Sequence, residues 1–65
     1  MERQILEPFV GRRVALTVND DGRVLFRRGI IKQVREESLL LEFDGTLQAY
    51  ALSVVLTVRE PEKNV

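Results

Sequence analysis

Hydrophobic and polar residues alternate along residues 13–19 of the chain. Val14, Leu16 and Val18 are separated by polar or small residues, which is the period-two pattern of a strand with one buried face. The sequence Asn-Asp-Asp-Gly follows at 19–22, and an Asp-Gly pair after a strand pattern is typical of a hairpin turn, because glycine tolerates positive φ. The pattern therefore predicts a second, antiparallel strand immediately after this turn.

The second strand is predicted over residues 23–34, with a bend at Gly29. Glycine inside a strand usually marks a bulge or a sharp bend. Ile30 and Ile31 are both apolar, and a bulge at the glycine would reset which face points inward. The faces occupied by Arg27 and Arg28 depend on this bulge and are left open.

Three shorter strands are predicted after the polar loop that ends the second one, over about 38–43, 46–51 and 54–58. The first of these is apolar at nearly every position, which indicates a strand covered on both sides. A second Asp-Gly pair, at 44–45, predicts a hairpin between the first and second of the three. The third is rich in β-branched residues, as strands prefer.

The two ends of the chain differ from this strand pattern. A one- or two-turn helix is predicted over about 2–8, ending near Glu7 because Pro8 lacks an N–H. Residues 59–65 are charged and contain a proline, which predicts a loose tail. The apolar positions that define one face of the helix are Ile5, Leu6, Phe9 and Val10.

These elements predict one mostly-β domain spanning 1–65: a short N-terminal helix and a five-stranded, strongly bent antiparallel barrel of the SH3-like kind. Phe9, Phe26 and Phe43 are expected in its core. A chain of 65 residues buries only about 60% of its unfolded surface and needs further support. The sequence has no Cys and no His, which excludes disulfides, thiolate sites and the commonest metal ligand. Oligomerisation is the support that remains.

The composition also narrows the class of protein. No signal-peptide core or run of about 20 apolar residues is present, so we expect a cytoplasmic protein with no membrane partner. The carboxylates Glu36, Glu37, Glu42 and Asp44 are expected to be solvated charges, and no nucleophile–base pair or phosphate loop accompanies them. We therefore expect no enzyme, no cofactor and no metal.

Charge is distributed unevenly although the net charge is zero. Residues 1–35 contain eight Lys/Arg and four Asp/Glu, whereas residues 36–65 contain two and six. Such asymmetry can give one basic and one acidic face, and arginine binds phosphate in a bidentate manner. Two alternatives are a mixed soluble surface and cross-strand pairing of the cations with Glu36, Glu37 and Glu42. The basic set is Arg12, Arg13, Arg23, Arg27, Arg28, Lys32 and Arg35.

A short amphipathic helix, then G-R-R-V-A-L-T-V, a D-G turn, G-I-I-K-Q-V and L-L-L-E-F-D-G resemble the Sm-like family. The resemblance covers about Ile5 to Val58. It implies a helix ahead of five bent strands and a homo-oligomeric ring, commonly a hexamer or heptamer, in which the fourth strand of one subunit pairs with the fifth of the next. It also implies binding of single-stranded RNA.

The family's motifs are matched in part. Gly29, Ile31 and Val34 supply the glycine and spaced apolar residues of the first motif. Arg35 stands where that motif has an acidic residue, and Ser38 is nearest to its RNA-contacting asparagine. Leu52-Ser53 replaces the arginine-glycine pair of the second motif. The segment Q-A-Y-A-L-S-V-V is similar to the bacterial Sm-like RNA chaperone, with Tyr50 and Ser53 matching and its lysine-histidine pair absent.

The hypothesis that follows is a non-enzymatic ring-forming protein that binds single-stranded RNA. The alternatives are an SH3-like protein-interaction or scaffold module without nucleic-acid binding, and a small designed barrel. Unpaired fourth and fifth strands would expose an edge that a neighbouring subunit covers. The candidate phosphate ligands are Arg27, Arg28, Lys32 and Arg35. The candidates nearer the bases are Ser38, Tyr50 and Ser53. The candidate subunit-interface residues are Tyr50, Leu52, Val54, Val55 and Leu56.

Overall fold

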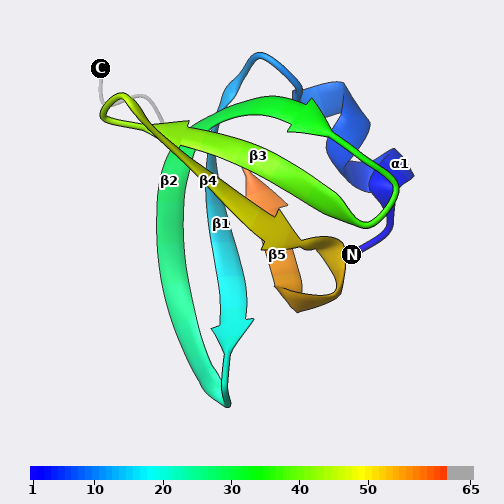
Figure 1. Cartoon of the computed structure of the whole chain (residues 1–65), viewed down its shortest axis with the longest axis vertical. Coiled ribbons are helices and arrows are strands. Elements are labelled where there is room, and N and C mark those ends of the chain that lie inside the picture. Colours follow the sequence, from blue (N-terminus) through cyan, green and yellow to red (C-terminus); the bar gives the residue numbers. More distant parts are fainter. Residues whose placement is uncertain (62–65) are drawn as a thin grey trace.

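The computed structural model describes residues 1–61 and shows a mostly-β chain with a short helix at its N-terminus (Figure 1). Five antiparallel strands form one open sheet in the order β4-β3-β2-β1-β5. The helical elements are α1 (Arg3–Leu6), η1 (Glu7–Phe9) and η2 (Leu52–Val54). The strands are β1 (Arg13–Asp20), β2 (Arg23–Val34), β3 (Ser38–Phe43), β4 (Thr46–Ala51) and β5 (Val55–Arg59).

The element boundaries differ from the predicted ones at the two ends of the chain. The predicted helix over 2–8 is one α-helical turn followed by the 3-10 turn η1, whose first turn contains Pro8 and so needs no N–H there. Val54 belongs to η2, and β5 extends through Arg59, the first residue of the predicted loose tail. Glu60 is also held in place, because it pairs with Arg12. The rest of the predicted tail, residues 62–65, lies outside the described residues.

The β1–β2 hairpin sets which residues share a face of the sheet. Its turn places Asp21 at φ 52° and Gly22 at φ 84°, and the Gly22 N–H donates to Asn19 Oδ1 at 3.1 Å. Asp20 therefore pairs with Arg23, and the register continues without interruption to the other end of β1. Side chains directly opposite in a sheet lie on the same face.

The second strand curves strongly around the rest of the sheet (Figure 1). Gly29 lies at this curve, but the extra residue is not there: the register with β1 is continuous through Gly29, and the register with β3 shifts between Ile31 and Gln33. The bulged residue is therefore Lys32. The predicted position of the bulge was wrong because the pairing with β3, and not the glycine, determines where the ladder is interrupted.

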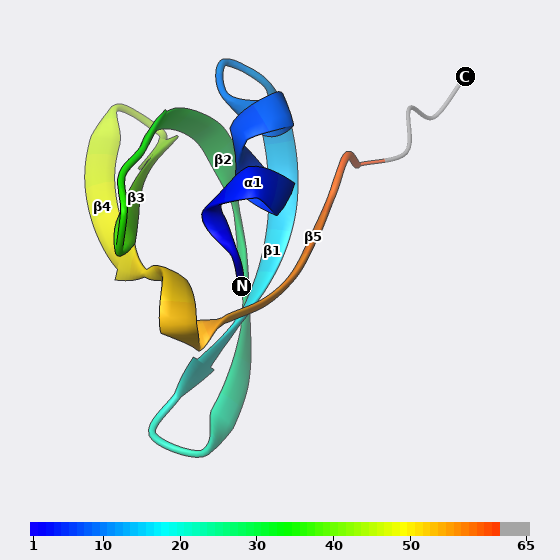
Figure 2. The same ribbon diagram turned by 90° about the vertical axis from the view of Figure 1, so that its right-hand side faces the viewer.

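The core lies inside the bend of the sheet. Figure 2 shows β3 and β4 on one side, β1 and β5 on the other, and α1 between them at one end. In β3 only the inward face is fully buried, because Leu40 and Glu42 are half-buried, so the prediction of a strand covered on both sides was wrong. The buried core residues are Leu6, Val14, Leu16, Val18, Ile31, Leu39, Leu41, Leu52 and Val55.

No helix among residues 1–61 combines the length and the apolar composition required to cross a bilayer.

Candidate nucleic-acid interface

Arg27 and Arg28 are neighbours on β2 but point to opposite sides of the sheet. Arg27 pairs with buried Leu16 and so lies on the inward face, where it is half-buried, and its Nη1 donates to the Phe26 carbonyl at 2.9 Å. Arg28 pairs with Ala15 and points outward, where it is exposed. The structure thus decides the question that the sequence left open.

Phe26 shares the outward face with Arg28, and 72% of its surface is exposed. Phe43, at the end of β3, is 59% exposed. The prediction that both residues lie in the core was wrong, because Leu25 and not Phe26 is opposite buried Val18. Phe9 is half-buried and packs against the core, in accord with its predicted position.

A groove beside Phe26 brings together basic residues from β2 and β5. Its lining includes Phe26, Arg28 and Arg59, and Arg28 also lines a second groove with Arg13 and Phe43. The two grooves share one arginine and so form a continuous surface. We call this surface the outer arginine face. Its members are Arg13, Phe26, Arg28, Phe43 and Arg59.

Arg13, Arg28 and Arg59 form no ion pair within residues 1–61, although Glu60 lines the first groove and Glu42 and Asp44 line the second. The ion pairs within this range are Arg3 Nε–Glu7 Oε1 at 2.9 Å, Arg12 Nη1–Glu60 Oε1 at 2.7 Å and Lys32 Nζ–Glu42 Oε2 at 3.9 Å. Only the last matches the cross-strand pairing considered from the sequence. The arginines of the outer arginine face are thus not held in ion pairs, but acidic side chains share their grooves.

The other predicted phosphate ligands lie elsewhere. Lys32 is at the bulge and faces Glu42. Arg35 follows β2, where its Nη2 donates to Gln33 Oε1 at 3.3 Å and its backbone N–H donates to the Ser38 carbonyl at 2.7 Å. Both side chains are exposed, but neither lines the grooves of the outer arginine face.

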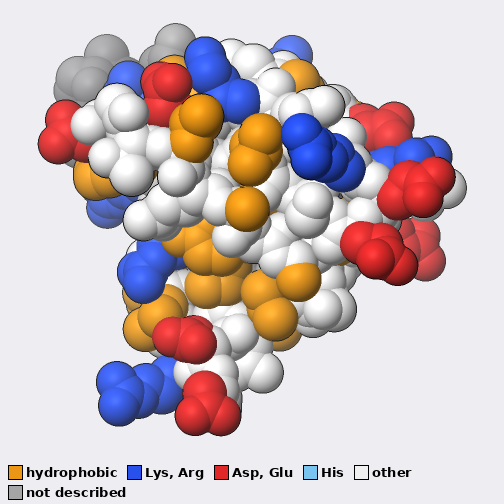
Figure 3. Space-filling model, viewed as in Figure 1, with side chains coloured by type: hydrophobic (Ala, Val, Ile, Leu, Met, Phe, Trp, Pro, Cys, Tyr) orange, Lys and Arg blue, Asp and Glu red, His pale blue; other side chains and the backbone are white. Residues whose placement is uncertain are grey.

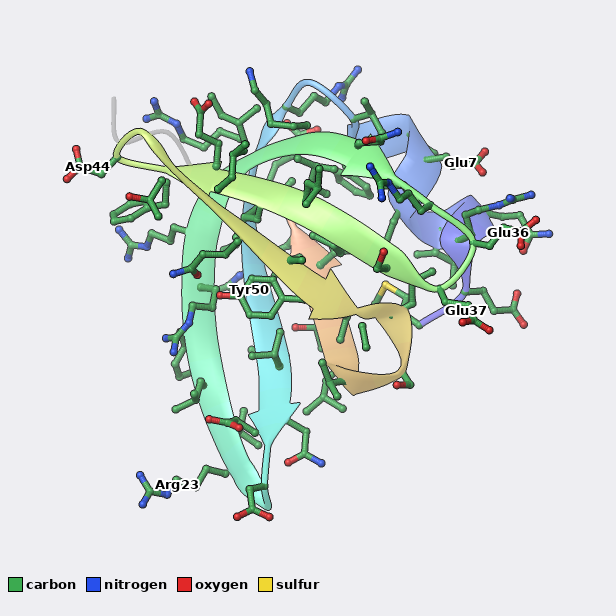
Figure 4. The ribbon with its side chains drawn as sticks, in the orientation of Figure 1. Glu7, Arg23, Glu36, Glu37, Asp44 and Tyr50 are labelled. Carbon is green, nitrogen blue, oxygen red and sulfur yellow. The ribbon has the colours of Figure 1, made fainter. Side chains whose placement is uncertain are left out.

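Ser38 and Ser53, two of the predicted base-contacting residues, lie at the end of the molecule that carries α1. Ser53 lines a groove together with Glu2, Glu36 and Glu37, and these three carboxylates form no ion pair within residues 1–61. Figure 4 shows Glu36 and Glu37 close to Glu7 at this end, away from Arg23 at the tip of the β1–β2 hairpin. Figure 3 shows several acidic side chains on the side of α1, with basic ones among them, and other acidic side chains at the hairpin tip and at the opposite upper corner. The groove also contains Arg3 and the N-terminal ammonium of Met1, so acidic and basic groups are mixed there.

Tyr50 is half-buried on β4 and packs against the core. It pairs with Leu39 across the β3–β4 ladder, so its ring faces inward, and its hydroxyl donates to Gln48 Oε1. A base could reach only the rim of this ring. The structure thus does not bring the seven predicted RNA-binding residues together. Arg28 belongs to the outer arginine face, Arg27 and Tyr50 are on the inward face, Lys32 is at the bulge of β2, Arg35 is in the loop after β2, and Ser38 and Ser53 are at the α1 end.

The predicted subunit-interface residues are also divided. Leu52 and Val55 are buried in the chain's own core, which contradicts their assignment to an interface. Val54 is half-buried against the same core, and Leu56 is 46% exposed. Leu56 is unpaired because the β1–β5 register shifts there, between the Val18–Val55 and Thr17–Thr57 pairs. The exposed edge of β5 is therefore its backbone and Leu56.

Within residues 1–61, no three acidic side chains gather closely enough to hold a metal ion. No protein-family model matches the chain, and comparisons with curated proteins and with solved structures found no significant match.

The outward orientation of Phe26 could have been predicted from the sequence. A two-residue hairpin loop at Asp21-Gly22 requires Val18 to lie opposite Leu25. Since Val18 is on the apolar face of β1, Leu25 points inward and Phe26 points outward. Arg59 could not have been found in this way, because its position depends on the bulged pairing of β1 with β5.

Proposed function

We propose that the chain is a non-enzymatic, Sm-like protein that assembles into a homo-oligomeric ring and binds single-stranded RNA on its outer arginine face. The observation that supports RNA binding is this face itself. It combines three arginines that have no carboxylate partner within residues 1–61 with two exposed phenylalanine rings. Arginine binds phosphate, and aromatic rings stack on bases without requiring a particular sequence.

Ring assembly is supported by the two ends of the sheet. β4 pairs only with β3 and β5 pairs only with β1, so each leaves one backbone edge unpaired within the described chain. An unpaired edge invites further strand pairing. Pairing β4 of one subunit with β5 of the next is a head-to-tail contact that closes into a ring when the rotation allows. Such a neighbour would cover the edges that the bent, open sheet leaves exposed.

The RNA ligands proposed here revise those predicted from the sequence. Arg28 remains, Arg27 contributes from the rim of the inward face, and Arg59, Arg13 and Phe26 are added. Lys32 and Arg35 are weaker candidates for RNA ligands, because they do not line the grooves of the outer arginine face. In a ring, each subunit would repeat the outer arginine face, and every phosphate it neutralises would release counterions and raise the affinity.

The experiment is an anisotropy titration of the purified protein with a fluorescent single-stranded RNA at two salt concentrations, with the native mass measured in parallel. We expect binding that weakens with salt and a mass near six or seven times 7.5 kDa. An RNA duplex of the same length is the control ligand, and it should bind more weakly because its bases cannot stack on phenylalanine. A monomer without RNA affinity would overturn the proposal and favour the SH3-like interaction module.

A further inference from the structure

Phe26 protrudes next to a hollow on the same outward face of the sheet. With 72% of its surface exposed, its ring stands above its neighbours. On its β5 side runs a groove that Arg59 lines at one end and whose other lining residues include Ala15, Thr17, Thr57 and Val58. These side chains are small, and they leave room for a larger group. The exposed Phe26 ring and the groove thus lie side by side on this face.

The floor of this groove can be covered by apolar atoms at low cost. The hydroxyl groups of Thr17 and Thr57 hydrogen-bond to each other at 2.6 Å across the β1–β5 ladder. This bond gives each hydroxyl one partner and so lowers the cost of covering them, although only one of the two hydroxyl hydrogens is used in it. Val24, two residues before Phe26 on the same face, is 57% exposed and extends the apolar surface toward the hairpin tip.

We propose that this face docks on the same face of a second copy of the chain, related to the first by a two-fold axis. A two-fold contact uses one patch twice, so it requires a patch that is complementary to itself. A protruding ring beside a hollow meets that requirement: the Phe26 ring of each copy enters the groove of the other. No residue of β4 takes part in this contact.

The order of charges along the hairpin favours an antiparallel approach. Asp20 and Asp21 lie at its tip beside one cation, Arg23 (Figure 4), and Phe26 lies in the middle. Arg28 lies beyond it in a groove that it shares with Arg59 and Glu60. Turning the second copy around the axis brings its acidic tip toward the arginines of the first. The contact covers Phe26 and Arg28, so a docked pair would compete with RNA for this face. The docked pair itself requires no RNA and is independent of the proposed function.

The test compares the native masses of the wild-type chain and Phe26→Ser by light scattering over a range of micromolar concentrations. At the lowest concentrations we expect both proteins to have the mass of the repeating unit. As the concentration rises, the wild type alone should approach twice that mass. Val10→Ser is the matched control, because Val10 is an exposed apolar residue outside this face and outside β4 and β5. It should keep the doubled mass. Equal circular dichroism spectra and melting temperatures would show that the variants are folded.

A wild-type mass equal to that of Phe26→Ser at every concentration would overturn the proposal, whatever the RNA affinity. Charge reversal tests the orientation: Arg28→Glu should raise the dissociation constant of the pair at least tenfold, and adding Asp21→Lys should recover most of the loss. Failure of the double variant to recover, with its fold intact, would overturn the antiparallel contact. Leu56→Lys, on the β5 edge, should leave the doubling unchanged and so separates this contact from ring assembly.

Discussion

The carbonyl oxygen of Glu42 lies where a side chain on Gly29 would begin. A β-carbon built on Gly29 would overlap that oxygen and would lie 3.0 Å from both the Glu42 carbonyl carbon and Leu41 Cγ. β2 and β3 can therefore approach this closely only because residue 29 has no side chain. The curve of β2, and with it the shape of the whole sheet, depends on this approach.

Gly29→Ala should therefore destabilise the fold by about 2 kcal/mol or more, since overpacking against backbone atoms cannot be relieved by a rotamer change. The measurement is urea denaturation followed by circular dichroism. Gly22→Ala is the control: it also replaces a glycine but meets no atom within 4 Å, so only its backbone conformation, at about 1 kcal/mol, opposes it. Equal losses of stability in the two variants would contradict the close approach as the cause.

The helix is expected to stabilise the sheet through one side chain. Leu6 is fully buried, whereas its neighbour Ile5 is 50% exposed. Leu6→Ala should cost about 2–4 kcal/mol by removing buried methyl groups and leaving a cavity, a large part of the roughly 3–10 kcal/mol expected for a domain of this size. Ile5→Ala should cost less than about 0.5 kcal/mol. Similar midpoints for both variants in thermal denaturation would show that α1 does not close the core.

RNA affinity should depend on Arg28 and Arg59 together. We expect the Arg28→Ala/Arg59→Ala variant to lower the affinity for single-stranded RNA at least tenfold. The slope of log affinity against log salt should also fall in magnitude by about 0.7 for each phosphate that the variant no longer neutralises. Arg3→Ala is the control, because Arg3 pairs with Glu7 at the other end of the molecule.

The Lys32→Ala/Arg35→Ala variant distinguishes between two possible RNA sites. Lys32 faces Glu42 and Arg35 lies outside the grooves, so we expect a smaller loss of affinity than for the outer-face pair. A larger loss would instead place the RNA along the β2 bulge, as the Sm-like resemblance implied from the sequence.

Ring assembly should depend on the edge of β5. Leu56→Lys places a charge on an unpaired edge strand, a change that opposes strand pairing between chains. We expect the native mass to fall from that of the ring to that of a single chain or a docked pair, while the variant stays folded. Val10→Lys, at an exposed position outside β4 and β5, should leave the mass unchanged. An assembly that survives Leu56→Lys would exclude β5 as the contact edge.

Most strands were predictable because local signals determine them. Alternation defined β1, and the Asp-Gly turns at 21–22 and 44–45 placed β2, β3 and β4, whose starts agree with the predicted ones. The bulge was misplaced at Gly29 because no turn of defined length joins β2 to β3. The loop over residues 35–37 leaves their register to side-chain packing. The burial of Leu52 and Val55 could not be predicted either, because the apolar run that contains them has no clear period.

The sequence by itself determined the class of fold, the order of its elements, and the absence of cysteine and histidine chemistry, because these follow from local periodicity, turn residues and composition. The tertiary structure decided which arginines lie together and which phenylalanines are exposed. It brought Arg59 of β5 beside Arg28 and Phe26 of β2, residues that are distant in the chain, and it separated Arg28 from Ser38 and Ser53. The physical reason is strand register: it is set by pairings between distant segments, and a shift of one residue moves a side chain to the other face.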